Sequence, residues 1–196
     1  MVLVIDTSSH RSALALVAGG EALAEDVVMD GRERDLPERV LAIVEPRRVE
    51  AVAVAVGPGS FTGLRVGVSY GVGLAMGLRV PLLGFGSLDL QAARTGRAAT
   101  AAVDAGRGRL YWREPGAEPR LGAPAELPRE LPVVGWLRPD TAEAVRVAGL
   151  LLLPDEALAG FAQTAAMLVG SAARLGYDTV ELRYMQSFRP MRESRG

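Results

Sequence analysis

The chain has 196 residues, a formal net charge of −1, and 49% hydrophobic and 23% charged residues. This composition is ordinary for a soluble globular protein, and the charge excludes a molecule-wide field that would attract nucleic acid or acidic lipid. All 22 basic side chains are Arg, so a Schiff base, a lysine general base and a Walker lysine are excluded. Cys is absent, which excludes thiolate chemistry and, with no signal-peptide pattern at the N-terminus, leads us to expect a cytoplasmic protein.

The first half of the chain alternates between strand and helix patterns. The expected elements are strands at 2–6, 12–18 and 21–28, a helix at 35–45, a strand at 49–57, a helix at 62–78, a strand at 80–85 and a helix at 87–94. Gly19-Gly20 suits a two-residue hairpin turn, Asp35 and Ser87 suit helix N-caps, and the Val-rich run at 49–57 is typical of a buried parallel strand. The order predicts an α/β unit with an antiparallel start and parallel crossovers.

The second half repeats the opening pattern of strand, Asp, turn and strand. Its expected elements are a hairpin at 98–114 turning at 106–108, a loop at 115–130, strands at 130–136 and 149–155, a helix at 155–175 and a tail beyond 177. The repeat predicts a duplicated α/β fold whose second copy is degenerate. We expect an N-terminal domain at 1–97 and a smaller C-terminal domain at 98–196.

The expected helix at 62–78 contains five glycines. Each costs roughly 1 kcal/mol of helix stability against alanine, so close packing against a neighbour must offset them. The glycine face, together with the helix at 35–45, is therefore the predicted surface for a homologous chain, although the chain's own elements are the alternative neighbour. The predicted partner interface comprises Leu36, Val40, Val44, Gly63, Val66, Gly67, Tyr70, Gly71 and Leu74.

Several chemistries are disfavoured by the pattern. Ser69 lies in a G-x-S-x-G match, but by periodicity it falls inside a helix rather than on the sharp turn of a hydrolase. His10 is the single histidine and is expected to be an exposed turn residue, so no metal site is predicted. Only thirteen residues separate Arg65 from Arg79, too few for the roughly 20 that span a membrane.

A strand–Gly-Pro-Gly-Ser–helix junction at 57–60 leaves free amides at a helix N-terminus, which gives weak affinity for anions. The alternative is that these residues only form a tight turn and cap the helix. No cofactor is expected, and the weak candidates for a cofactor-binding site are Asp6, Ser8, Gly59, Ser60, Asp104 and Gly106.

The stretches VIDTSSHRSALAL, GPGSFTGLR, VDAGRGRLYW and VELRYMQSF resemble the TsaB (YeaZ) family over essentially the whole chain. The resemblance implies an actin/Hsp70/sugar-kinase-like duplicated fold. It also implies a non-catalytic subunit that pairs with the catalytic TsaD-type protein and the TsaE-type ATPase to make threonylcarbamoyladenosine at position 37 of tRNAs reading ANN codons. Homodimers are implied as well, with tRNA contacted only through the complex and no membrane association.

Two departures from the family pattern bear on activity. Arg32-Glu33-Arg34 stands where many relatives have Arg-Glu-His, and Asp6-Thr7-Ser8 lacks the Asp-x-Gly of phosphate-gripping hairpins, which only Asp104-Ala105-Gly106 matches formally. The alternative function is a nucleotide-binding ATPase or phosphotransferase that uses Asp6 and Asp104. A peptidase is disfavoured because a histidine pair and a serine triad are missing. Any contact of this subunit with tRNA is expected from the tail residues Arg183, Arg189, Arg192 and Arg195.

Overall fold

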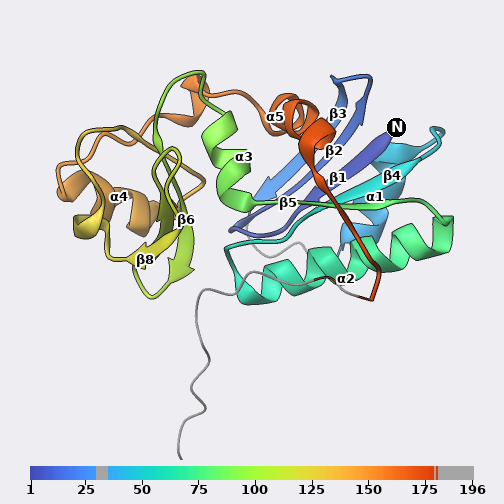
Figure 1. Cartoon of the computed structure of the whole chain (residues 1–196), viewed down its shortest axis with the longest axis horizontal. Helices are drawn as coiled ribbons and strands as arrows, with labels where there is room; N and C mark the ends of the chain where they lie inside the picture. The colour runs from blue at the N-terminus through green and yellow to red at the C-terminus, as the bar shows by residue number, and fades with distance from the viewer. Residues whose placement is uncertain (30–34, 179, 181–196) are drawn as a thin grey trace, which may run out of the picture.

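The N-terminal half of the chain builds a mixed sheet (Figure 1). The computed structural model describes residues 1–29, 35–178 and 180, and within them this first sheet has six strands in the order β10-β5-β4-β1-β2-β3. The strands are β1 (Val2–Asp6), β2 (Arg11–Ala18), β3 (Glu21–Met29), β4 (Ala51–Ala55), β5 (Leu82–Phe85) and β10 (Ala173–Leu175). β1, β2 and β3 form an antiparallel meander, whereas β4 and β5 run parallel to β1. The predicted antiparallel start and parallel crossovers are confirmed.

Helices cover both faces of the first sheet (Figure 1). One face carries α1 (Leu36–Val44) and α2 (Phe61–Leu78), and the other carries α3 (Ser87–Ala93) and α5 (Phe161–Leu168). Leu3 and Ile5 of β1 belong to the apolar cluster under α1 and α2, while Val4 between them belongs to the cluster under α5. This alternation is the period of two expected for a strand buried on both faces. The predicted helices at 35–45 and 62–78 are confirmed.

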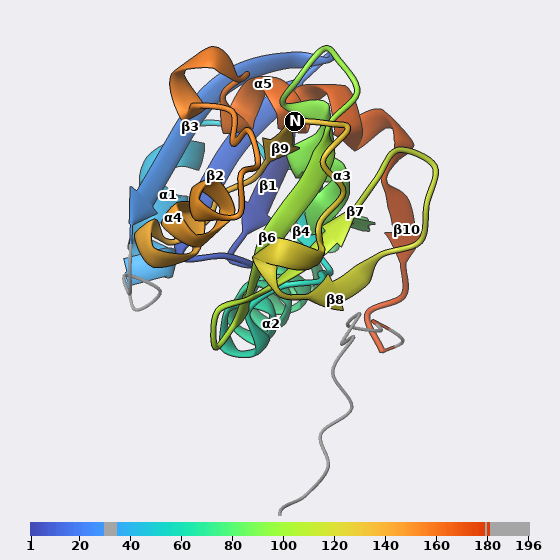
Figure 2. The same cartoon turned by 90° about the vertical axis from the view of Figure 1, so that its left-hand side faces the viewer.

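The second half contributes a smaller sheet, seen from its own side in Figure 2. Its strands are β8 (Arg120–Gly122), β7 (Arg109–Arg113), β6 (Thr100–Gly106) and β9 (Val133–Val134), in that order, and α4 (Pro139–Val147) packs on them. The hairpin predicted at 98–114 is confirmed. The strands predicted at 130–136 and 149–155 are much shorter in the structure. β9 ends where Gly135 lies against the carbonyl of Ala102. The segment 149–155 contributes only a bridge from Leu152 to Val133.

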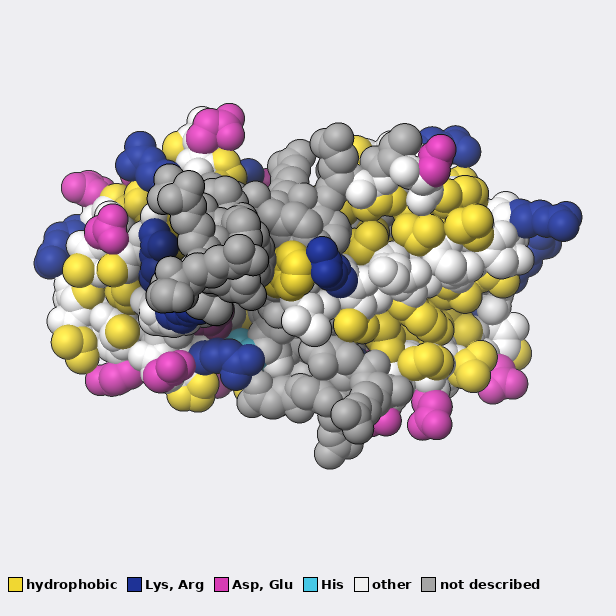
Figure 3. All heavy atoms as spheres, turned by 90° about the horizontal axis from the view of Figure 1, so that it is seen from below, with side chains coloured by type: hydrophobic (Ala, Val, Ile, Leu, Met, Phe, Trp, Pro, Cys, Tyr) yellow, Lys and Arg dark blue, Asp and Glu magenta, His cyan; other side chains and the backbone are white. Residues whose placement is uncertain are grey.

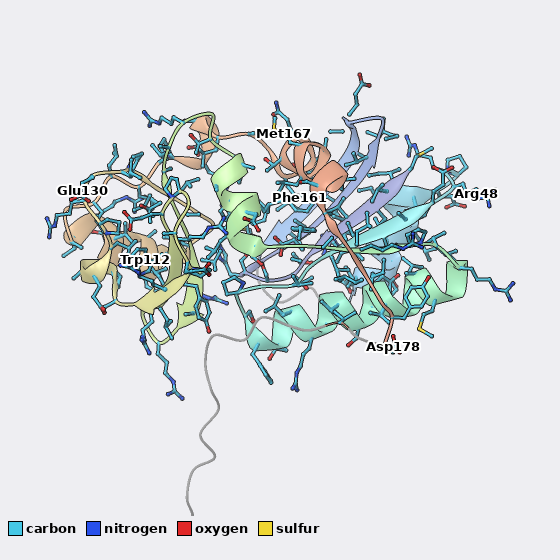
Figure 4. All side chains as sticks on the ribbon, viewed as in Figure 1. Arg48, Trp112, Glu130, Phe161, Met167 and Asp178 are labelled. Carbon is cyan, nitrogen blue, oxygen red and sulfur yellow. The ribbon has the colours of Figure 1, made fainter. Side chains whose placement is uncertain are left out.

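The helix predicted at 155–175 is wrong in its length. The segment instead forms a 3-10 turn (Asp155–Ala157), α5, a second 3-10 turn (Val169–Ser171) and β10. α5 begins directly after Gly160, which is its N-cap, and Gly170 lies in the turn that separates α5 from β10. Figure 4 shows Phe161 on the side of α5 that faces the sheet and Met167 on the opposite side.

The C-terminal segment therefore returns to the first sheet. We call the first sheet with α1, α2, α3 and α5 the first lobe, and the second sheet with α4 the second lobe. The sequence assigned all of 98–196 to the second domain, but α5 and β10 pack in the first lobe. We propose to keep a domain boundary at residue 97 with this return included in the N-terminal domain.

Helix starts also differ in part from the prediction. Asp35 occupies the N-cap of α1, yet its side chain makes no capping hydrogen bond. Ser87 is the first residue of α3, and Gly86 is the N-cap. Ser60 caps α2, since its hydroxyl oxygen accepts a hydrogen bond from the Gly63 amide at 3.2 Å.

The glycine face of α2 packs on the chain's own sheet. A Cβ at Gly63 would lie 1.9 Å from the Thr7 carbonyl oxygen, and a Cβ at Gly71 would lie 2.3 Å from Cγ1 of Val54. Gly67 meets the Thr7 hydroxyl in the same way. The prediction that this face docks a partner is therefore wrong. The helix is apolar on two sides, and its periodicity could not tell which of the two faces the sheet.

Alanine substitutions at two glycines of α2 test this assignment. Gly71→Ala inserts a methyl group against the fully buried Val54, and we expect a loss of about 1–3 kcal/mol in the free energy of unfolding. Gly73→Ala meets no atom within 4 Å, and we expect a gain of up to about 1 kcal/mol from helix propensity. Urea denaturation measures both values. Equal effects at the two positions would contradict the packing described.

Candidate functional site

A cleft of about 240 Å³ separates the two hairpin turns of the lobes. Its lining residues are Ser9, His10, Gly59, Ser60, Phe61, Asp104, Ala105, Gly106, Tyr111 and Arg138. Four of the predicted cofactor-binding candidates, Gly59, Ser60, Asp104 and Gly106, line this cleft. The motifs in the sequence thus identified residues of both halves that lie in one cleft, but they did not predict how the two halves pack together.

The start of α2 is held against the turn between β1 and β2. The Ser60 amide donates a hydrogen bond to the Ser8 carbonyl at 2.7 Å. A Cβ at Gly59 would lie 2.2 Å from the same oxygen, so a glycine is required there. The two predicted candidates Ser8 and Ser60 are therefore neighbours, and Ser8 contributes its backbone to this contact.

Asp6, the last residue of β1, is buried and does not line the cleft. Its carboxylate is 1% exposed, Oδ1 accepts a hydrogen bond from the Ser8 amide at 2.8 Å, and Oδ2 has no partner among the described residues. Burial raises the pKa of Asp6 above its ordinary value, and the hydrogen bonds from Ser8 oppose this shift only in part. A buried carboxyl with an unsatisfied oxygen destabilises the fold, which marks Asp6 as a candidate for function.

His10 is buried in the cleft, so the prediction of an exposed turn residue is wrong. Its side chain is 2% exposed, and Nδ1 lies 3.8 Å from Oδ2 of Asp104 in the opposite lobe. The same Asp104 oxygen accepts a hydrogen bond from the Arg138 amide at 2.8 Å. Sequence reasoning also missed Phe61 and Tyr111, because no local pattern links the residues of the two lobes.

The described residues do not assemble a metal site or an activated serine. They contain no group of three or more His, Cys, Asp or Glu side chains placed to hold a metal ion. Ser69 lies in the middle of α2, away from the turn that an activated serine requires. What the cleft does offer is the N-terminus of α2, where backbone amides and the helix dipole favour an anion. In the same part of the chain, no helix has the length and apolarity needed to cross a membrane.

The outer face of α2 is a second candidate site. Of the predicted interface residues, Leu36, Val40, Gly63, Gly67 and Gly71 are buried, whereas Val44, Val66, Tyr70 and Leu74 are half-buried. Large apolar side chains that were not predicted are exposed beside them: Leu41 by 64%, Met76 by 54% and Leu78 by 48%. Figure 3 shows hydrophobic side chains gathered over the half of this face where α2 lies.

Comparisons with known proteins point to one family. A model for tRNA N6-adenosine threonylcarbamoyltransferase (TsaD) matches residues 39–123. The tRNA threonylcarbamoyladenosine biosynthesis protein TsaB of Escherichia coli is 33% identical over 127 residues, which cover 58% of this chain and 54% of that protein. The TsaB protein of Bacillus subtilis is 31% identical over 123 residues, covering 56% and 52%.

The chain is similar to proteins of the TsaB (YeaZ) family. The solved structure of YeaZ from Pseudomonas aeruginosa has the same fold, with a TM-score of 0.72 at 21% identity, covering 94% of this chain and 99% of the other. The two-lobed α/β architecture is consistent with the actin/Hsp70/sugar-kinase-like fold expected from the sequence. The chain spans about half the length of the curated TsaB proteins that it matches.

The raised pKa of Asp6 gives a pH-dependent test of its role. As the pH rises above the ordinary Asp value of 3.8, the carboxyl ionises more readily in the unfolded chain than in the folded one. Folding stability is therefore lost between that pH and the raised pKa of the folded state. Asp6→Asn removes the ionisable group, so we expect a gain in melting temperature at pH 7 that shrinks as the pH falls through the raised pKa of the folded state toward 3.8.

Asp35→Asn is the matched control, because Asp35 is exposed and its side chain caps nothing. Thermal unfolding followed by circular dichroism between pH 3.5 and 8 measures both variants. A gain at Asp6 that is the same at every pH would show that burial of the charge is not its cause.

Proposed function

We propose that this chain is a non-catalytic partner subunit in the synthesis of threonylcarbamoyladenosine at position 37 of tRNAs that read ANN codons. In this role it binds and activates a TsaD-type catalytic subunit. The names of its TsaB relatives support the pathway. The observation that carries the role of a partner subunit is the exposed apolar face of α2.

The outer face of α2 has the shape that a second helix needs. Ser69, Gly73 and Gly77 are exposed and recur every fourth residue, and a Cβ at either glycine meets nothing within 4 Å. Small residues at this spacing form a shallow groove in which another backbone can approach closely. Tyr70 and Met76 flank the groove and provide apolar area for a partner.

The family model suggests which partner fits this groove. The TsaD model matches residues 39–123, a range that includes α2. A TsaD-type protein is therefore expected to carry a counterpart of this helix, and two like surfaces can pair about a two-fold axis. The same geometry allows a homodimer when the partner is absent. A TsaE-type ATPase is the proposed third component, tRNA is contacted only through the complex, and the location is the cytoplasm.

The main alternative is an ATPase or phosphotransferase acting in the cleft. The meeting of Asp104, Ser60 and the N-terminus of α2 favours it. Against it stand the missing Lys and Cys and the single His of the sequence. The tail arginines expected to touch tRNA, and Arg32-Glu33-Arg34, lie outside the described residues.

Gly73→Arg tests the docking face. The new side chain extends into open space, so the chain stays folded, but it fills the groove and blocks a second helix. We expect loss of the complex with the TsaD-type protein of the same genome, measured by sedimentation velocity of the mixture. Gly96→Arg is the control, since Gly96 is also exposed and a Cβ there would meet no atom within 4 Å, but it lies after α3. A folded Gly73→Arg variant that still binds would reject this interface.

Calorimetric titration with ATP distinguishes the proposed role of a non-catalytic subunit from the alternative of an ATPase or phosphotransferase. We expect no saturable heat and no ATP hydrolysis by the isolated chain, and less than one equivalent of bound iron or zinc by metal analysis. Saturable binding that Ser60→Ala weakens would favour the phosphotransferase alternative, because Ser60 lies where a phosphate would meet α2.

A further inference from the structure

Two arginines of the first lobe share one carboxylate. Nη1 of Arg11, at the start of β2, lies 2.6 Å from Oδ2 of Asp155, and Nη2 of Arg94, just after α3, lies 2.5 Å from Oδ1. Asp155 lies two residues after Leu153, whose amide donates a hydrogen bond to the Val133 carbonyl in the second sheet at 2.9 Å. The carboxylate is thus fixed to the second lobe while both of its partners belong to the first.

Trp136 completes this contact from the second lobe. It lies two residues beyond β9, yet it is 2% exposed and belongs to the apolar cluster between the first sheet and α5. The guanidinium carbons of Arg11 and Arg94 each lie 5.0 Å from the centre of its ring, within the range of a cation–π interaction. On the α5 side, the ring centre of Phe161 is 5.9 Å away.

Arg94 is the more enclosed of the two arginines. Its side chain is 3% exposed, and besides Asp155 it donates hydrogen bonds to the Ala159 carbonyl at 3.0 Å and to Oε1 of Gln91 at 3.3 Å. Partial burial raises the pKa of Asp155, but the hydrogen bonds from Arg11 and Arg94 outweigh it and hold that pKa below its ordinary value. Removing the carboxylate would leave a buried guanidinium without its counter-charge, which is strongly unfavourable.

The chain passes between the lobes at only two places within the described residues, after α3 and before α5. Two crossings define a hinge axis, about which lobes of this kind can rotate. We propose that Arg11, Arg94, Asp155 and Trp136 form an interlobe latch that blocks this rotation and holds the cleft at one width. His10, next to Arg11 in sequence, faces Asp104 across the cleft, so the same turn meets the second lobe at two points.

The absence of Cys allows this proposal to be tested with site-directed spin labels. Thr62→Cys and Arg107→Cys place labels at exposed positions next to the cleft residues Phe61 and Gly106 of opposite lobes. Double electron–electron resonance then measures the distance distribution across the cleft. With the native latch we expect one narrow distribution, and with Asp155→Asn or Trp136→Ala a broader one shifted to longer distances.

Glu156→Gln is the matched control, because it makes the same charge change at the neighbouring residue. Circular dichroism establishes that each variant is folded before the distances are compared. Arg11→Gln, at the less buried of the two arginines, is the second variant in case Asp155→Asn does not fold. Folded latch variants with the distribution of the native chain would overturn the proposal, as would an equal broadening in Glu156→Gln.

Discussion

The rest of the structure depends on the contact between two backbones where α2 begins. The Ser60 amide donates to the Ser8 carbonyl, and the Thr7 hydroxyl donates to the Gly63 carbonyl at 2.6 Å. No side chain fits between these segments, so the glycines lower helix propensity while making the contact possible. The contact closes the turn over Asp6, presents the N-terminus of α2 to the cleft and leaves the opposite side of the helix for solvent or a partner.

The order of elements in the first half could be predicted because it depends on local patterns. The alternation in the first strands, the Val-rich β4 and the glycine-punctuated α2 are all signals within a few residues of each other. The orientation of α2 was not predictable in this way. The helix is apolar on two sides, and contacts with residues distant in sequence, such as Val54 against Gly71, set which side faces inward.

The candidate site was predictable as a set of turns but not as a cleft. Each hairpin contained its own Asp and a turn pattern, whereas the proximity of His10 and Asp104 follows from how the lobes pack, which no spacing encodes. The same limit explains the C-terminal error. An apolar run after residue 155 has the pattern of one helix, but its place on the first sheet is set by contacts such as the Ala162 amide with Oε2 of Glu25 at 2.5 Å.

The cleft and the outer face of α2 are connected through the turn between β1 and β2, which packs against α2 and also contacts the second lobe. A docking helix binds with least loss of entropy when it is already held in one position, and α2 is held by the turn that also carries His10 and Arg11. Arginine suits the contacts on Asp155 because one planar group can donate to a carboxylate and lie over an indole at once, which an ammonium does less well. A chain of this fold can therefore keep an interlobe cleft whose polar residues join the lobes, whether or not the cleft binds a ligand.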